Sequence, residues 1–158
     1  MKYTVKNGAQ NLLFEGVQLS HSSSFVPGKS RWIEFSIYRT LTGQYVVSRV
    51  GRSLVYHHAT CPTVKRNRID PLPEQVLPED MVACDICHPD RDIDEILYPE
   101  ISREAATSCF NADGVVKWMK QKDENGINYL TNVAKDALED AAEIDPEISR
   151  AFYTERID

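Results

Sequence analysis

The chain has 158 residues, a length that suits one ordinary domain or two small ones. Hydrophobic residues make up 42% and charged residues 27%, as in globular proteins, and no apolar run approaches the roughly 20 residues that a membrane-spanning helix needs. The N-terminal residues lack the apolar core of a signal peptide. We therefore expect a cytoplasmic protein with reduced cysteines and no membrane partner.

The net charge of −6 is distributed unevenly along the chain. Residues 1–68 contain ten Lys or Arg and two Asp or Glu, a charge of +8, whereas residues 69–158 contain eight and twenty-two, a charge of −14. This asymmetry suggests that the basic half faces a nucleic acid or another acidic partner. The alternative is that two solvated surfaces of opposite charge attract one another within the molecule.

The first 56 residues predict an antiparallel β-sheet. The mostly apolar run NLLFEGVQLS leads into a loop rich in Ser, Pro and Gly. In RWIEFSIYR, Ile33, Phe35 and Ile37 alternate with the polar Glu34 and Ser36, which is the period of a strand. The turn TLTG and the runs QYVVSRV and SLVYH follow at short separations, so we expect a small antiparallel meander.

Three of the four cysteines and three of the four histidines lie between residues 57 and 88. In this stretch, His57 and His58 precede Cys61, and Cys84 is separated by two residues from Cys87. Two such pairs, distant in sequence, can complete a closed four-ligand site, and thiolate and imidazole ligands favour Zn²⁺ over Mg²⁺ or Ca²⁺. The spacing predicts one structural zinc ion, with one histidine and three cysteines as ligands.

The stretches YHHATCP and ACDICHPD together resemble the metal-binding module of Ada-type DNA methylphosphotriester repair proteins. That family has an aromatic residue, a first ligand, three residues and a cysteine, and then C-x-x-C-x-P two to three dozen residues later. The resemblance covers about residues 55–90, and it implies that the ligands are His57, Cys61, Cys84 and Cys87. His58 and His88 are then neighbours of the ligands.

The first ligand differs from that of the Ada-type module in a way that bears on activity. The family has a cysteine at this position, and its thiolate accepts the methyl group. The matching residue here is His57. A neutral imidazole is no equivalent methyl acceptor, so the resemblance implies metal binding and not repair.

Three other interpretations of the cluster stay open. Residues 84–88 match C-x-x-C-H, the attachment pattern of c-type haem, but that attachment normally needs export and would leave the first His/Cys pair unexplained. A thioredoxin-like dithiol would need a βαβ setting, which the flanking residues do not indicate. The last is a reduced cluster that binds no metal.

Residues 92–158 predict an acidic helical segment. SREAATSCFN begins with Ser102 as a candidate N-cap, and NADGVVKWMKQ and INYLTNVAKDALEDAAE space their apolar residues by three and four. Asp145 followed by Pro146 is a strong signal for the start of a last helix. The predicted fold class is α+β, with a β-rich domain and zinc module over residues 1–91 and the helical segment over residues 92–158.

No Walker A loop, GxGxxG motif or clear pair of carboxylates is present, so no catalytic residue is predicted. His21 is expected in a loop, and Cys109 as a small buried side chain. The favoured function is a non-catalytic zinc protein that binds a nucleic acid or a protein. The alternatives are a nucleic-acid-processing enzyme with an unrecognised site, and an assembly protein that uses the acidic helices. The candidate nucleic-acid contacts are Arg31, Arg39, Arg49, Arg52, Lys65, Arg66 and Arg68.

Overall fold

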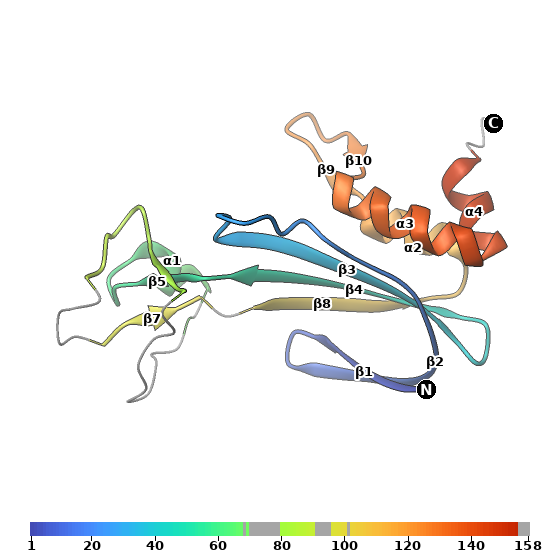
Figure 1. Cartoon of the computed structure of the whole chain (residues 1–158), viewed down its shortest axis with the longest axis horizontal. Helices are drawn as coiled ribbons and strands as arrows, with labels where there is room; N and C mark the ends of the chain where they lie inside the picture. Colours follow the sequence, from blue (N-terminus) through green and yellow to red (C-terminus); the bar gives the residue numbers. More distant parts are fainter. Residues whose placement is uncertain (68, 70–79, 91–95, 101, 155–158) are drawn as a thin grey trace. The chain divides into compact units, whose positions relative to one another are not determined.

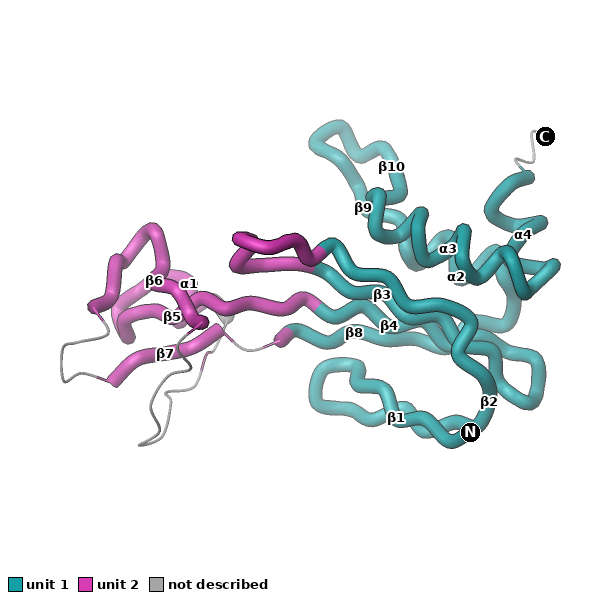
Figure 2. Tube along the Cα trace, in the orientation of Figure 1, with its two compact units in different colours: residues 1–24, 33–50, 103–158 teal, residues 25–32, 51–102 magenta. Residues whose placement is uncertain are grey.

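The computed structural model describes residues 1–67, 69, 80–90, 96–100 and 102–154. The chain forms two compact units, shown in Figure 2. Unit 1 consists of residues 1–24, 33–50 and 103–158, and unit 2 of residues 25–32 and 51–102. The predicted boundary between residues 91 and 92 lies outside the described residues. No helix in the described part of the chain is long and apolar enough to span a membrane.

Unit 1 is built on a five-stranded sheet with the order β1-β2-β3-β4-β8 (Figure 1). Strand β2 pairs antiparallel with both β1 and β3. The antiparallel sheet and the helices that follow it confirm the predicted α+β class. The strands are β1 (Lys2–Asn7), β2 (Gln10–Ser23), β3 (Arg31–Thr40), β4 (Tyr45–Ser53) and β8 (Arg103–Cys109), and the division between the units falls within β3 and β4.

Strand β2 is long because its two halves serve different partners. Residues 10–15 pair with β1, and residues 16–23 pair with β3. The change occurs at Gly16, where a Cβ atom would lie 2.1 Å from the carbonyl oxygen of Arg39, so only glycine allows this approach. The backbone N–H of Gly8, just after β1, donates to the carbonyl of Glu104 in β8 at 2.7 Å. The first and last strands of the sheet therefore meet, and the sheet is nearly closed into a barrel.

The sheet of unit 1 carries a buried core on each face. On one face, Phe35 and Ile37 are 1% and 0% exposed and pack with residues of the C-terminal helices, as their period of two predicted. Ser22 of β2 donates its hydroxyl hydrogen to the carbonyl of Val133 in the helix above at 2.7 Å. On the opposite face, a second core forms around Tyr38. Its other buried members are Val5, Val46 and Ala106.

The helices begin where their capping residues indicate. They are α2 (Ala112–Met119), α3 (Asn132–Ile144) and α4 (Pro146–Tyr153). As predicted, Asp145 caps α4: its Oδ1 accepts hydrogen bonds from the backbone N–H groups of Glu147 and Ile148 at 3.0 and 3.1 Å. Helix α3 starts later than its apolar spacing suggested, because the preceding residues pair as a hairpin. The strands of that hairpin are β9 (Gln121–Lys122) and β10 (Asn128–Tyr129).

The helix predicted from Ser102 is wrong, since these residues form strand β8. The run contains two alanines and a plausible cap, both of which favour a helix locally. In the structure, β8 pairs beside β4, and Ala106 is 3% exposed within the core around Tyr38. Pairing and burial in the sheet therefore override local propensity, as is common for short strands.

The described residues of unit 2 form a small sheet with the order β6-β5-β7 and one short helix. Strand β5 (Val55–His57) pairs parallel with β6 (Val82–Ala83) and antiparallel with β7 (Tyr98–Pro99), and α1 (Pro62–Asn67) follows β5. Among the described residues, the buried core around β5 contains two thiols in addition to three aliphatic side chains. Its members are Val55, Cys61, Val64, Ile69 and Cys84.

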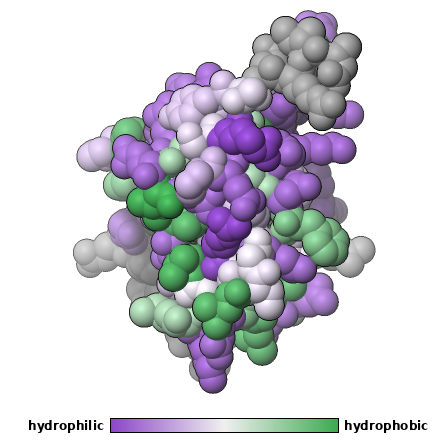
Figure 3. Space-filling view, turned by 90° about the vertical axis from the view of Figure 1, so that its right-hand side faces the viewer, coloured by the Kyte–Doolittle hydropathy of each residue, from purple (hydrophilic) through white to green (hydrophobic). Residues whose placement is uncertain are grey.

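The face of the molecule drawn in Figure 3 carries hydrophobic side chains interspersed with hydrophilic ones. The described part of this face therefore presents no continuous apolar layer of the kind that obligate interfaces bury. The exposed apolar side chains of unit 1 include Leu13, Val17, Leu41, Phe110 and Ile144.

Candidate metal centre

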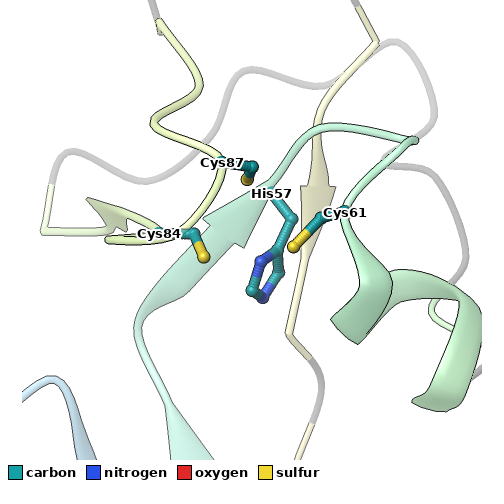
Figure 4. A group of neighbouring side chains, drawn as sticks. All are labelled: His57, Cys61, Cys84 and Cys87. Carbon is teal, nitrogen blue, oxygen red and sulfur yellow. The ribbon is translucent and has the colours of Figure 1, made fainter.

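The predicted ligands converge in unit 2, as Figure 4 shows. One ligand atom from each of His57, Cys61, Cys84 and Cys87 lies within 4.8 Å of the others. His57, Cys61 and Cys84 are 0%, 1% and 3% exposed, and Cys87 is half-buried. All four cysteines of the chain are free thiols. The cluster could therefore hold one metal ion.

Both ligand pairs are positioned by short backbone turns next to strand β5. His57 is the last residue of β5, and the N–H of Cys61 donates to the carbonyl of His58 at 3.1 Å as the chain turns into α1. The N–H of Cys84 donates to the carbonyl of Tyr56 in β5 at 3.0 Å. The turn after Cys84 closes when the N–H of His88 donates to the Cys84 carbonyl at 2.9 Å, with His88 at a positive φ of 46°.

Backbone N–H groups point at two of the sulfur atoms. The N–H of Ile86 donates to Sγ of Cys84, and the N–H of His58 donates to Sγ of Cys87, each at 3.4 Å. Such donors favour the thiolate over the thiol, because they stabilise its negative charge. The turns that bring the ligands together therefore also place a backbone donor at Sγ of Cys84 and at Sγ of Cys87.

The thiols influence one another's ionisation. Burial opposes ionisation of Cys61, but hydrogen bonds from the backbone and hydroxyl of Thr63, and from the thiol of Cys87, lower the pKa of Cys61 to about 7. Burial raises the pKa of Cys87 to about 11, and its hydrogen bonds to the other two thiols add to the rise. Because like charges at this spacing repel, a cation bound among the sulfur atoms would favour their negatively charged form.

Of the two ring nitrogens of His57, Nε2 has a hydrogen-bond partner and Nδ1 has none. Nε2 lies 2.7 Å from Oε1 of Glu100, so this nitrogen carries the proton and donates to the carboxylate. Nδ1 is buried and has no hydrogen-bond partner. A buried polar atom without a partner is costly, and a metal ion at Nδ1 would satisfy it. The residues present thus fit a metal ion, and His57, rather than His58, is the histidine of the cluster.

Glu100 is a part of the site that sequence reasoning did not identify. It lies 43 residues after His57, and no spacing rule connects the two. Its carboxylate also accepts two hydrogen bonds from Arg31, from Nε at 3.0 Å and from Nη2 at 2.5 Å. Burial alone would raise the pKa of Glu100, but hydrogen bonds from Arg31, Ser53 and His57 lower it to about 2. The carboxylate is therefore a fixed negative charge beside the imidazole.

No protein-family profile, curated protein or solved structure matches this chain. The chemistry of the cluster itself therefore carries the functional assignment.

The geometry bears on the other interpretations of the cluster. Attachment of haem at residues 84–88 would use both cysteine sulfurs and the following histidine. Instead, the sulfurs of Cys84 and Cys87 lie in one group with His57 and Cys61, and His88 is not a member of it. The C-x-x-C pair follows the two-residue strand β6 rather than a βαβ unit. The four-residue group matches a metal site more closely than either alternative.

The basic residues predicted to contact nucleic acid are divided between the units. Arg39 of unit 1 forms ion pairs with Asp145 at 2.9 Å and Glu147 at 2.7 Å, and its guanidinium lies 5.0 Å from the centre of the Tyr45 ring. Arg49 is half-buried in unit 1. In unit 2, Arg31 binds Glu100, and Arg68 lies outside the described residues. The predicted contacts that are exposed in unit 2 are Arg52, Lys65 and Arg66.

Two residues outside the cluster have surroundings that the sequence did not reveal. His21, expected in a loop, lies on β2, with Nδ1 2.8 Å from the hydroxyl of Ser36 and Nε2 3.6 Å from Glu34. Ser36 is 7% exposed within the regular strand β3, which does not present it as a nucleophile. Cys109 is half-buried, and its burial raises the pKa of its thiol.

Proposed function

We propose that the chain is a zinc-binding protein in which His57, Cys61, Cys84 and Cys87 hold one structural Zn²⁺. The observation that carries this proposal is the convergence of three thiols on a buried imidazole whose Nδ1 has no partner. Sulfur and nitrogen donors suit zinc, whereas Mg²⁺ and Ca²⁺ require oxygen ligands. When bound, the ion supplies positive charge that lets buried thiolates coexist.

A structural role is supported by the number of protein donors and by the small size of unit 2. Four side chains complete the ligand set of a typical structural zinc site, whereas catalytic sites keep a position for water. In the part of unit 2 that the structure describes, the strands are two or three residues long and the buried core around β5 is small, so metal binding would contribute directly to folding. The likeness to Ada-type modules supports metal ligation, and His57 argues against methyl transfer.

Metal content tests this proposal directly. Protein purified without a metal-affinity step should contain one zinc ion per chain by elemental analysis and native mass spectrometry. Cobalt substitution should give the absorption bands of a tetrahedral sulfur-rich site. Protein that contains no stoichiometric zinc, and that takes up neither zinc nor cobalt after reduction of its thiols, would contradict the proposal.

The zinc unit is further proposed to serve as a non-catalytic interaction module, with nucleic acid as the first partner class. The support is the basic N-terminal half of the sequence, of which Arg52, Lys65 and Arg66 are exposed in unit 2. The engagement of Arg31 and Arg39 with carboxylates leaves fewer cations for phosphate contacts. A protein partner is the alternative, and it would account for the same exposed residues.

A binding titration distinguishes the two partner classes. Single- and double-stranded oligonucleotides should bind at low salt, and the affinity should fall steeply as salt rises. Replacing Lys65 and Arg66 by Ala should lower the affinity and reduce the slope of its salt dependence by about 1–2. If neither oligonucleotide binds at tens of micromolar protein, the nucleic-acid proposal fails and a protein partner takes its place.

A further inference from the structure

Glu100 joins the candidate metal ligand to a segment far away in the sequence. Its Oε1 lies within hydrogen-bond distance of both Nε2 of His57 and Nη2 of Arg31, and its Oε2 accepts from Nε of Arg31. The two parallel N–H···O bonds form a bidentate guanidinium–carboxylate pair, the strongest and most directional form of this interaction. Arg31 and Glu100 are 69 residues apart.

Arg31 belongs to the tip of the β2–β3 hairpin, residues 25–32, which is grouped with unit 2. The tip is attached to the rest of unit 2 by a backbone bond as well, since the N–H of Leu54 donates to the carbonyl of Ser30 at 2.8 Å. Within the tip, the rings of Phe25 and Trp32 stack edge to face with their centres 4.8 Å apart. The tip is thus a small ordered element with a charged connection to the histidine of the cluster.

The connection has a physical consequence for metal binding. A carboxylate that accepts the proton of one imidazole nitrogen fixes the tautomer and presents the lone pair of the other nitrogen. A cation at Nδ1 would make the N–H at Nε2 a better donor and would strengthen its bond to Glu100. Arg31 orients the carboxylate through its two hydrogen bonds. Coupling between two sites is reciprocal. If metal binding strengthens the hydrogen bonds that link His57, Glu100 and Arg31, these hydrogen bonds must strengthen metal binding in return.

We propose that Arg31 and Glu100 are positioning residues of the metal centre, and that they couple its occupancy to the order of the hairpin tip. This inference rests on the proposed metal binding at His57, Cys61, Cys84 and Cys87. It gives Arg31 a role different from the phosphate contact that the charge distribution suggested. Through Arg31 and Glu100, the order of the tip depends on the metal as well.

Metal affinity is the first readout, measured for zinc by competition with a chromophoric chelator. Glu100→Gln keeps the size of the side chain and removes its charge, and it should weaken zinc binding by about 10- to 100-fold. Arg31→Ala should weaken it less, by about 3- to 10-fold, and Arg31→Lys should be intermediate, because lysine cannot form the bidentate pair. The cobalt spectrum should persist in all three variants, since the four ligands are unchanged.

Matched controls come from exposed residues of unit 1. Arg150→Ala and Glu124→Gln make the same chemical changes at exposed residues of unit 1 distant in sequence from the cluster, and they should leave zinc affinity within about twofold of that of the unsubstituted protein. If Glu100→Gln or Arg31→Ala binds zinc as tightly as these controls, the positioning role is overturned. If the unsubstituted protein binds no zinc at all, the proposed function itself is overturned. Failure of the positioning role and failure of the proposed function are therefore distinguishable.

Fluorescence of Trp32 is the second readout. Trp118, which packs against the core of unit 1, is replaced by Phe so that Trp32 is the sole tryptophan. Adding zinc to the metal-free protein should shift the Trp32 emission to shorter wavelength, because the tip becomes ordered against the rest of unit 2. With Arg31→Ala in the same background, saturating zinc should produce a much smaller shift. Equal shifts in the two proteins would show that Arg31 does not couple the metal to the tip.

Discussion

Units 1 and 2 reach a folded state by different physical means. Unit 1 buries a five-stranded sheet on both faces, with Phe35, Tyr45 and Leu138 each at most 1% exposed. In the described part of unit 2, strands β5, β6 and β7 have two or three residues, and thiols lie beside aliphatic side chains in the core. Apolar burial can therefore account for unit 1, whereas unit 2 resembles small modules that depend on a metal for folding.

The largest expected effect is the loss of a metal ligand. Cys84→Ser should abolish stoichiometric zinc binding and remove on the order of 10 kcal/mol of apparent folding free energy from unit 2. Differential scanning calorimetry should show a lost or strongly lowered transition. The matched control is Cys109→Ser, which changes the one cysteine outside the cluster and should leave metal content intact. Similar behaviour of the two variants would contradict a special role for the cluster.

A substitution that creates a cavity in the core of unit 1 should have the opposite effect, lowering stability without lowering zinc content. Leu138 is 0% exposed in the core between sheet and helices, so Leu138→Ala should destabilise unit 1 by about 3 kcal/mol. Zinc content should stay at one ion per chain under native conditions. Chemical denaturation followed by tryptophan fluorescence and elemental analysis would check both statements. Loss of zinc from the folded variant would show that the two units do not depend on separate sources of stability.

A smaller effect is expected where Arg39 joins the sheet of unit 1 to helix α4. Asp145 is 3% exposed, pairs with Arg39 and accepts a hydrogen bond from the Tyr45 hydroxyl at 3.0 Å. Asn is an equally good helix cap, so Asp145→Asn isolates the lost charge and should cost about 1–2 kcal/mol in urea denaturation. Glu147→Gln is the control, because that pair is half exposed and should contribute less than about 0.5 kcal/mol. Equal costs would argue against a buried ion pair.

Local patterns in the sequence predicted much of unit 1. The alternation in β3 identified its buried face, and Asp145 followed by Pro146 marked the start of α4. These signals work because they depend on the backbone of their own segment. The prediction of a helix where β8 lies is wrong, because the alanines of β8 favour a helix locally, while its burial beside β4 depends on residues distant in sequence.

The difference between local patterns and contacts distant in sequence also explains which residues of the cluster could be predicted. The spacing of the two pairs, together with the likeness to Ada-type modules, predicted the four residues that the structure brings together. Arg31 and Glu100 could not be predicted, because each reaches the cluster only through the pairing of β5 with β7 and the return of the β2–β3 hairpin. No spacing rule describes such contacts, and the charge distribution alone predicts a phosphate contact for Arg31.

Hydrogen exchange measured by mass spectrometry before and after removal of the metal tests the central claim most directly. Peptides from unit 2, such as residues 51–67 and 80–90, should lose protection when a strong chelator is added under reducing conditions. Peptides from β3, β4 and α3 in unit 1 should keep their protection, because apolar burial stabilises them. Unchanged protection in unit 2, or an equal loss of protection in both units, would contradict the account.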